Sequence, residues 1–200
     1  MKASSSSLRS SKSRPTSAET VVNLSDAQAL RHVLVVGGTT AEWDDLGLEL
    51  WAARRNDLAK VVAHAGAMWL TVRPFSAGDG QRVSLTERMI DVREGCTVII
   101  DPSTDGRARL LAAIEQLRDL PPDAVDEASI AAVLMAPAPV EPDLTVILGS
   151  PQHLPPSLVW ELAYSEIVYI DARWDDLGGA HVEQAVDAYS RRHRRFGGIQ

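Results

Sequence analysis

The sequence predicts an α/β fold in which a mainly parallel sheet is flanked by helices. Four short runs of aliphatic and β-branched residues, at 32–36, 68–72, 97–100 and 144–148, have the length and composition of strands covered on both faces. Turn residues and segments with helical spacing lie between most of these runs, which is the order that builds a parallel sheet. The chain has 200 residues, of which 45% are hydrophobic, so it can bury one good core.

Two helices are expected around the first strand. Ser25 and Asp26 can cap a short lead-in helix at 23–31. A longer helix is expected at 46–65, where apolar residues follow the spacing of one core-facing stripe and Gly66 ends the helix. That stripe consists of Leu58, Val61, Val62 and Ala65. After the second strand, the stretch from 76 to 96 predicts only a polar connection with one helical turn at about 85–92.

Two more helices are expected before the fourth strand. Asp105 can cap a helix in which Leu110, Ile114 and Leu117 share one face, and the prolines at 121–122 end it. A second short helix is predicted at 123–135. Together with the strands, these helices complete one domain.

The N-terminal residues have a different composition. Residues 1–22 are rich in serine, carry Lys2, Arg9, Lys12 and Arg14, and have few apolar side chains, so we predict a disordered tail before a domain at 23–200. The tail has no apolar core of a secretory signal. No later run reaches the roughly 18 apolar residues that a membrane-spanning helix needs. We therefore expect a cytoplasmic protein without a transmembrane segment.

Charge and cysteine content narrow the function classes. The formal net charge of −7 argues against a nucleic-acid binder, because neutralising phosphates needs a basic face. Cys96 is the one cysteine, so the chain can build neither an internal disulfide nor a thiolate metal cluster.

The C-terminal stretch at 158–198 carries the most specific pattern. It holds an apolar segment, a short strand, an amphipathic helix and a basic run that ends in Phe-Gly-Gly. Arg194 and Arg195 offer forks that match phosphate oxygens, and Gly197 lets the backbone approach a ligand closely. An ordinary helix C-cap explains the same residues, so the pattern alone leaves both interpretations open.

The order of these motifs resembles the C-terminal part of the cis-prenyltransferases, the undecaprenyl diphosphate synthase family. The matching elements are LVWELAYSE at 158–166, a strand, a W-x-D element, a helix and RRHRRFGG at 191–198. Segments 32–36, 69–76, 103–107 and 143–146 resemble strands and turns of the same family. The resemblance implies the cis-prenyltransferase fold. Shortened tunnel helices are expected, because the stretch from 76 to 96 is too short for the family's long ones at about 1.5 Å of rise per residue.

The loop after the first strand departs from the family pattern. Gly38 stands where the family has an aspartate that holds magnesium and the allylic diphosphate, and Glu42 replaces an arginine that faces phosphate. Leu48 replaces a substrate-contacting histidine, whereas Trp43 is retained. As a nucleotide-binding loop, the Gly-Gly-Thr-Thr stretch fits neither the Walker pattern nor GxGxxG.

The loop after the fourth strand departs as well. The family's arginines and serine there bind the diphosphate of isopentenyl diphosphate, but this chain has Ile147, His153 and Pro155 at those positions. Glu166 matches a magnesium ligand of the family, and without the partner aspartate we favour a structural carboxylate.

The resemblance with these losses implies a degenerate, non-catalytic subunit of the Nogo-B receptor type, which serves a catalytic cis-prenyltransferase partner in a heteromer. The partner is expected to supply Mg²⁺; this subunit is expected to hold no catalytic residue, metal or cofactor. Arg195 and Gly197 are then expected to bind isopentenyl diphosphate in the partner's site. The expected interface comprises Leu158, Trp160, Leu162 and Tyr164. Through the complex the subunit could lie at the membrane surface.

Two alternatives remain from the sequence. One is a pseudoenzyme that binds an isoprenoid diphosphate or acts as a scaffold without serving a synthase. The other is a self-sufficient homodimeric prenyltransferase, which the residues Gly38, Ile147 and His153 disfavour.

Overall fold

The computed structural model describes residues 29–78 and 88–196, with side chains through Arg192. Six strands form one sheet in the order β3-β4-β2-β1-β5-β6. All neighbours are parallel except β3 and β4, which form an antiparallel hairpin at one edge. The strands are β1 His32–Val36, β2 Trp69–Arg73, β3 Met89–Arg93, β4 Cys96–Ile100, β5 Leu144–Leu148 and β6 Glu166–Ile170. The predicted fold class, a mainly parallel sheet flanked by helices, is confirmed.

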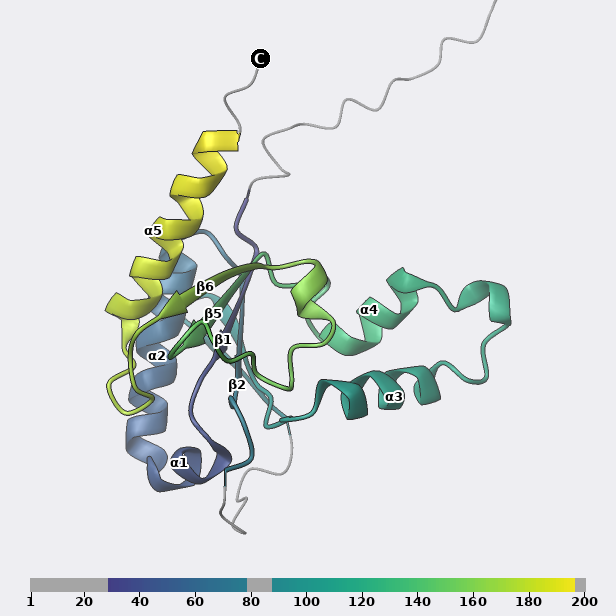
Figure 1. Ribbon diagram of the computed structural model, residues 1–200, viewed down its shortest axis with the longest axis horizontal. Coiled ribbons are helices and arrows are strands. Elements are labelled where there is room, and N and C mark those ends of the chain that lie inside the picture. The colour runs from purple at the N-terminus through teal and green to yellow at the C-terminus, as the bar shows by residue number, and fades with distance from the viewer. Residues whose placement is uncertain (1–28, 79–87, 197–200) are drawn as a thin grey trace, which may run out of the picture.

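Helices α2 and α5 cover one face of the sheet, with the short α1 at their lower end in Figure 1. Every residue of β1 and β5 is buried, which is why these strands read as unbroken apolar runs. On α5, Val182, Ala185 and Tyr189 face the main core at helical spacing. The helices are α1 Thr40–Asp45, α2 Leu48–His64, α3 Gly106–Gln116, α4 Glu127–Met135 and α5 Gly179–Phe196, with short 3₁₀ turns η2 Pro122–Ala124 and η3 Glu161–Ala163.

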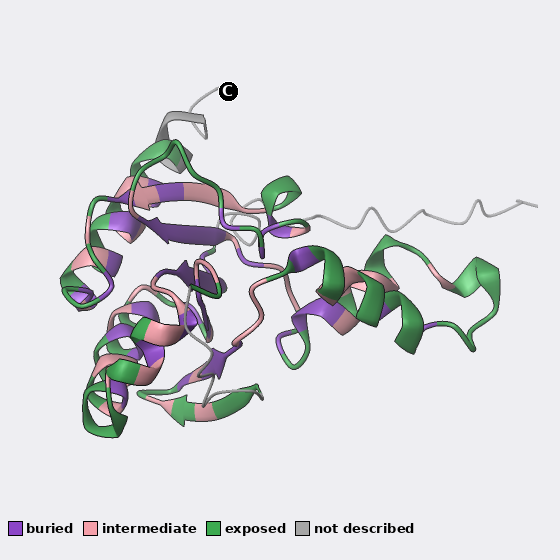
Figure 2. Ribbon diagram, turned by 60° about the horizontal axis from the view of Figure 1, so that its bottom comes forward, coloured by how far each residue is buried: buried purple, intermediate pink, exposed green. Residues whose placement is uncertain are grey.

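Helices α3 and α4 form a hairpin that projects away from the sheet (Figure 1). Figure 2 shows that exposed residues dominate this projection, while buried residues concentrate in the strands and on the inner sides of α2 and α5. The hairpin packs around a small cluster of Ala113, Leu134 and Met135. Asp105 caps α3 as predicted, and Asp126 caps α4.

Three predictions of local structure need correction. The described part of the helical turn expected at 85–92 is strand β3 Met89–Arg93, because Met89, Ile90 and Val92 pair with β4 across a tight turn in which Glu94 and Gly95 adopt positive φ. Residues 85–87 lie outside the described residues. The helix expected at 46–65 is present as α2 Leu48–His64, but it begins two residues later, because Gly47, with a φ of 75°, lies before the helix as its N-cap.

The third correction concerns the inner face of α3. Ala113 is buried there, whereas Ile114 is 44% exposed. The difference arises because α3 packs mainly against one neighbouring helix, α4, and the contact stripe is correspondingly narrow.

Predictions for the tail at 1–22 and for most of the lead-in helix at 23–31 lie outside the described residues. Within the described ranges, no helix is long and apolar enough to cross a membrane.

Candidate functional site

A cleft of about 330 Å³ lies at the carboxyl ends of the parallel strands. The chain places β2 on one side of β1 and β5 on the other, so the loops that follow β1 and β5 diverge at this point. Open parallel sheets commonly bind ligands in the crevice at such a switch in strand order. The residues that line the cleft come from the loops after β1, β2, β5 and β6: Gly38, Thr39, Glu42, Phe75, Leu148, Gly149, Ser150, His153, Ala172, Arg173 and Trp174.

Three tryptophans pack against one another beneath the cleft. The Trp43 and Trp174 rings stack with centroids 5.3 Å apart, and Trp51 meets the edge of Trp43 at 4.9 Å. The indole N–H of Trp43 donates to the Gly37 carbonyl, and that of Trp51 donates to the Trp43 carbonyl, both at 2.9 Å. Arg54 lies 4.6 Å above the Trp174 ring. The floor is therefore a rigid aromatic cluster, and the retained Trp43 belongs to packing.

The backbone at Gly38 leaves no room for a side chain. Gly38 has a φ of 69°, and a Cβ built there would lie 2.6 Å from Cγ of Trp174. L-residues rarely adopt this φ, and the tryptophan behind it is fixed by its stacking partners. Position 38, which the sequence resemblance predicts to match the family's metal-binding aspartate, thus carries no carboxylate and could accept one only after rearrangement.

Few charged groups around the cleft are available to a ligand. Glu42 is occupied in a capping box, where its carboxylate accepts the Thr39 N–H at 2.7 Å. Arg173 is 78% exposed and pairs with Asp175 at 3.3 Å. His153 is an exposed lining residue.

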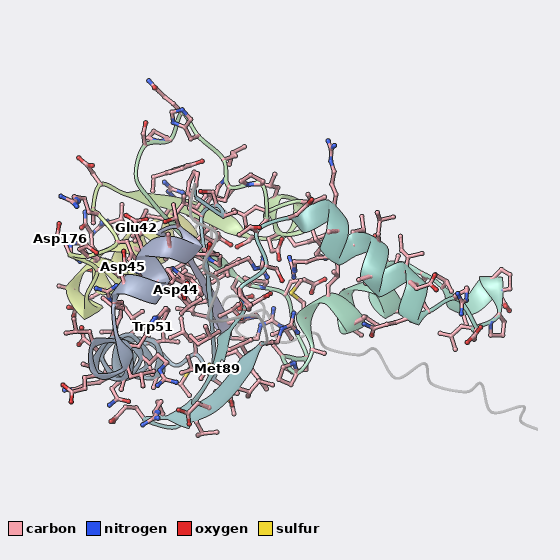
Figure 3. All side chains as sticks on the ribbon, turned by 90° about the horizontal axis from the view of Figure 1, so that it is seen from below. Glu42, Asp44, Asp45, Trp51, Met89 and Asp176 are labelled. Carbon is pink, nitrogen blue, oxygen red and sulfur yellow. The ribbon has the colours of Figure 1, made fainter. Side chains whose placement is uncertain are left out.

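Acidic groups are frequent around this end of the molecule. Figure 3 labels Glu42, Asp44 and Asp45 on α1 and Asp176 after β6. Of these residues Glu42 lines the cleft, so an anionic diphosphate bound there would meet like charge from it. This arrangement is poorly suited to holding a diphosphate without a metal ion.

The second predicted diphosphate loop carries no arginine at the positions where one was expected from the family. Ile147 is fully buried in a core cluster with Leu34 and Val36, on the face away from α2 and α5. Leu148 packs so closely on Gly37 that a Cβ there would lie 2.4 Å from it. Pro155 is buried. Of these residues only Leu148 lines the cleft, whereas Ile147 and Pro155 are buried away from it.

Glu166 lies at the opposite ends of the strands. It pairs in register with Leu144, which pairs with Val33 at the start of β1, so Gly38 is five residues further along. At about 3.3 Å per residue this separation is roughly 16 Å. Glu166 accepts a 2.8 Å ion pair from Arg192 of α5. Within one subunit, position 38 and Glu166 do not fit a shared Mg²⁺ site, and the described residues contain no group of three or more His, Cys, Asp or Glu side chains placed to hold a metal ion.

The predicted phosphate-binding end is only partly within the described structure. Arg195 lies in the last turn of α5, and its side chain is not described; Gly197 lies outside the described residues. Helix α5 itself is firmly placed, because its N-terminal Gly179 donates to Asp57 of α2.

The predicted interface residues fall into two groups. Leu158 is 2% exposed and belongs to the core of its own subunit, and Trp160 is half-buried beside the α3–α4 cluster. Leu162 and Tyr164 are 42% and 43% exposed, and with Val159 they form an apolar surface around η3. The Tyr164 hydroxyl donates to Glu127 of α4 at 2.6 Å, which fixes the ring on this surface.

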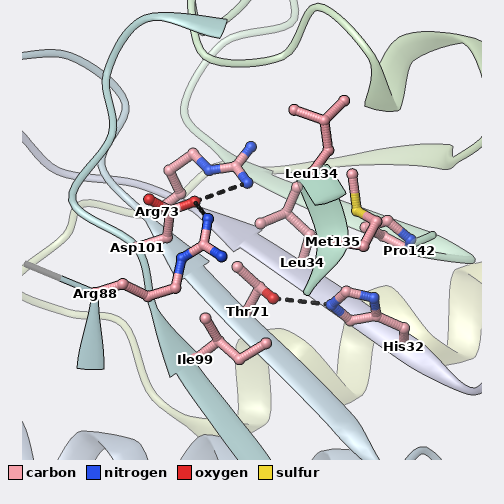
Figure 4. Close-up of a pocket in the computed structure, with 10 residues that line it drawn as sticks. All are labelled: His32, Leu34, Thr71, Arg73, Arg88, Ile99, Asp101, Leu134, Met135 and Pro142. Atoms are coloured by element: carbon pink, nitrogen blue, oxygen red, sulfur yellow. Dashed lines mark hydrogen bonds and ion pairs between the residues drawn. The ribbon is translucent and has the colours of Figure 1, made fainter. Parts of the chain in front are cut away.

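A buried ionic cluster beside η3 was not predicted. The Glu161 carboxylate accepts from Arg73 at 2.8 Å and from Arg109 at 2.9 Å, and Arg73 also reaches Asp101 at 3.2 Å. All four side chains are at most 8% exposed. Arg88 joins Asp101 at 3.3 Å from the partly exposed side (Figure 4). The sequence does hold a signal for this cluster, because Glu161 lies inside an otherwise apolar segment. A buried glutamate is stable only when it is paired with a cation.

The cluster keeps its carboxylates charged. Burial opposes ionisation of Asp101, but Arg73 and Arg109 outweigh it and lower the pKa of this carboxyl to about 2. The pKa of Glu161 is lowered by the same two arginines against the effect of its burial. The adjoining cavity measures about 10 Å³, the size of one water position. The cluster is therefore closed to a substrate.

Comparison with known proteins identifies the family. Residues 53–197 match the family model described as putative undecaprenyl diphosphate synthase. A ditrans,polycis-undecaprenyl-diphosphate synthase from Pectobacterium atrosepticum is 28% identical over 130 residues, which cover 62% of this chain and 51% of the relative. An isoprenyl transferase 2 from Bradyrhizobium diazoefficiens is 28% identical and covers 90% of this chain and 77% of the relative. An isoprenyl transferase from Streptococcus thermophilus is 36% identical over 146 residues, which cover 64% of this chain and 59% of the relative.

Solved structures agree with these matches at the level of the fold. A lavandulyl diphosphate synthase from Lavandula x intermedia superposes with a TM-score of 0.60 at 17% identity, covering 82% of this chain and 96% of that chain. A probable undecaprenyl diphosphate synthase from Campylobacter jejuni gives a TM-score of 0.57 at 15% identity, covering 84% and 98% of the two chains. The chain spans about half the length of several of the curated relatives that it matches. With most of its residues matched by the family model and the fold shared, this chain belongs to the undecaprenyl diphosphate synthase, or cis-prenyltransferase, family.

Proposed function

We propose that this chain is the non-catalytic subunit of a two-component cis-prenyltransferase, of the type that the Nogo-B receptor represents. The observation that carries the proposal is the backbone at Gly38: the position matched to the metal-binding aspartate has a φ of 69° and is closed by Trp174. A hard oxygen ligand for Mg²⁺ is therefore missing at this position. The neutral Ile147 and Pro155 at the second diphosphate loop support the same conclusion.

The catalytic partner supplies the aspartate, the Mg²⁺ and the hydrophobic tunnel in this proposal. The present subunit contributes Arg195 and the Gly197 backbone, which stabilise the diphosphate of isopentenyl diphosphate in the partner's active site. The family match supports this role, because it extends to residue 197. Loss of one such preorganised donor commonly costs about 10²–10³ in rate.

The partner is proposed to dock on the apolar surface around η3. Val159, Leu162 and Tyr164 are exposed there, and Leu158 and Trp160 support them from below. In this proposal the subunit works in the cytoplasm and reaches the membrane only through the complex.

Incorporation of radiolabelled isopentenyl diphosphate tests the proposal. Three preparations are compared: this protein alone, a candidate full-length cis-prenyltransferase alone, and the two co-expressed. We expect activity from the pair, a loss of about 10²-fold or more with Arg195→Ala, and little change with Arg191→Ala, an exposed arginine earlier on the same helix. Co-purification of each variant pair shows whether the complex stays assembled.

The names of the relatives favour a second candidate, a catalytic isoprenyl transferase that acts alone. Several are called isoprenyl transferases without a second subunit in their names. The same experiment separates the two: incorporation by this protein alone supports the second candidate. A partner that is fully active alone and never co-purifies with this chain contradicts the accessory role for that partner. The remaining alternative is then a pseudoenzyme that binds an isoprenoid diphosphate or acts as a scaffold for other proteins.

A further inference from the structure

A groove of about 880 Å³ runs between α2 and α5 on the outer side of the molecule, away from the cleft. Its floor is apolar and partly buried, formed by Val61, Ala63, Ala65 and Val186, which pack onto the main core. Such a floor between two helices offers contact to an added segment.

The rim of the α2–α5 groove is acidic. Four carboxylates line it, against one lysine and one histidine. The acidic residues are Asp57 on α2, Glu94 in the β3–β4 turn, and Glu183 and Asp187 on α5; Lys60 and His64 are the others. All six side chains are exposed, so the excess of negative charge faces whatever enters the groove.

The chain enters the domain at one end of this groove. The carbonyl of Arg31 accepts the N–H groups of Met68 and Trp69, just beyond the end of α2. Leu30 is buried in the same core cluster as Val62 of α2 and Tyr189 of α5. Arg31, near the first described residue, therefore lies close to the end of α2.

We propose that residues 1–22 of this chain dock in the α2–α5 groove and place their basic side chains against its carboxylate rim. The segment carries Lys2, Arg9, Lys12 and Arg14 but only one acidic residue, Glu19, in a chain whose net charge is −7. Its charge is thus complementary to the rim and opposite to that of the protein as a whole.

The covalent tether makes this docking feasible with few contacts. A segment attached by a short linker has an effective concentration in the millimolar range, so an intrinsic affinity of that order suffices. At about 3.3 Å per extended residue, the residues before Ala29 are long enough to follow the groove.

A spin label on the full chain tests the docking. Ser13→Cys places a nitroxide within the basic segment, while Cys96 is buried and its thiol pKa is raised by burial to about 11, which keeps it unreactive toward the label. We expect the label to broaden the backbone amide signals of 61–65 and 183–187. Raising the salt concentration to 1 M should restore these signals, because the Debye length falls to about 3 Å.

The control is a matched reversal of charge. Glu183→Lys with Asp187→Lys should abolish the broadening, whereas Asp119→Lys with Asp123→Lys, two exposed sites near the α3–α4 turn, should preserve it. Circular dichroism confirms that both double variants fold. Absence of broadening in the groove, or broadening that survives the rim reversal, overturns the proposal. Broadening seen only when labelled protein is mixed with a second, isotope-labelled copy identifies an intermolecular occupant and also overturns it.

Discussion

Two neighbouring regions at the carboxyl ends of the strands use charge in opposite ways. The cleft beside β1 and β5 is open to solvent but rests on three tryptophans and has no carboxylate at Gly38. The cluster at the ends of β2 and β4 gathers two carboxylates and two arginines but is closed to solvent. Chemistry on an external substrate needs charges that the substrate can reach. Comparison of the two regions therefore indicates that the charge-rich region is structural, whereas the accessible cleft carries no carboxylate at position 38.

Removing one member of the buried cluster should give the largest loss of stability. Glu161→Ala leaves Arg73 and Arg109 buried without their shared partner, which should reduce the free energy of unfolding by about 3–5 kcal/mol. Urea unfolding measures the change. Glu115→Ala, which breaks an ion pair that is about two-thirds exposed, should cost less than about 1 kcal/mol. Similar losses in the two variants would show that the buried cluster contributes no more to the free energy of unfolding than an exposed ion pair.

The cleft is expected to resist restoration of its missing carboxylate. Gly38→Asp combines a positive φ with overlap against Trp174, so we expect a loss of about 2–4 kcal/mol in unfolding free energy. Gly95→Asp provides the matched control, because its φ is 80° and nothing lies within 4 Å of a Cβ there. The control should lose only the unfolding free energy that the positive φ costs a non-glycine residue, about 1–2 kcal/mol. If Gly38→Asp is as stable as the control and binds Mg²⁺ by calorimetry, the steric argument for a degenerate site is wrong.

His32 borders the cluster and should make stability depend on pH. Burial lowers the pKa of His32 from 6.5 to about 4, against the opposing effect of its hydrogen bond to Val140. Its Nδ1–H donates to the Val140 carbonyl, which leaves Nε2 to accept from the Thr71 hydroxyl (Figure 4). The neutral ring is therefore held in one tautomer.

The folded and unfolded pKa values of His32 determine whether stability rises or falls with pH. Between pH 6.5 and 4 the unfolded chain binds a proton that the folded protein does not, so this contribution to stability is complete above pH 6.5 and is lost as the pH falls toward 4. From pH 7.5 to 5 we expect a loss of about 2 kcal/mol in the free energy of urea unfolding. His64→Gln, a change at an exposed site, should leave this loss intact. A stability that stays constant over this range would contradict the buried neutral state.

The strands were predictable because their local signal and their burial agree. The runs at 32–36 and 144–148 coincide with β1 and β5, whose residues are covered on both faces and so are uniformly apolar. Strand β3 was missed because an edge strand with Met89, Ile90 and Val92 exposed has no such signal. Its identity depends on pairing with β4, which local sequence does not report.

In the candidate site, too, some features could be predicted from local sequence and others depend on long-range contacts. The sequence shows directly that position 38 carries no carboxylate, while the match of this position to the family's aspartate stays a prediction. The closure of that position by Trp174, and the joining of Arg73 to Glu161, depend on contacts between residues far apart in the chain. Sequence patterns report which groups are present, but contacts of this kind follow only from the folded arrangement.

The smallest expected effect concerns the contact between the cleft floor and α2. Arg54 lies over Trp174 and donates to the Asp175 carbonyl at 2.9 Å. Burial lowers its pKa, but an arginine keeps its charge in proteins, so the cation–π contact persists. Arg54→Ala should lower the free energy of unfolding by about 0.5–1 kcal/mol and shift the tryptophan fluorescence, while Arg118→Ala, at a site 66% exposed, should change neither. A shift in fluorescence without a change in stability would mean that the Arg54 side chain only borders the aromatic cluster, which would then owe its rigidity to the three rings alone.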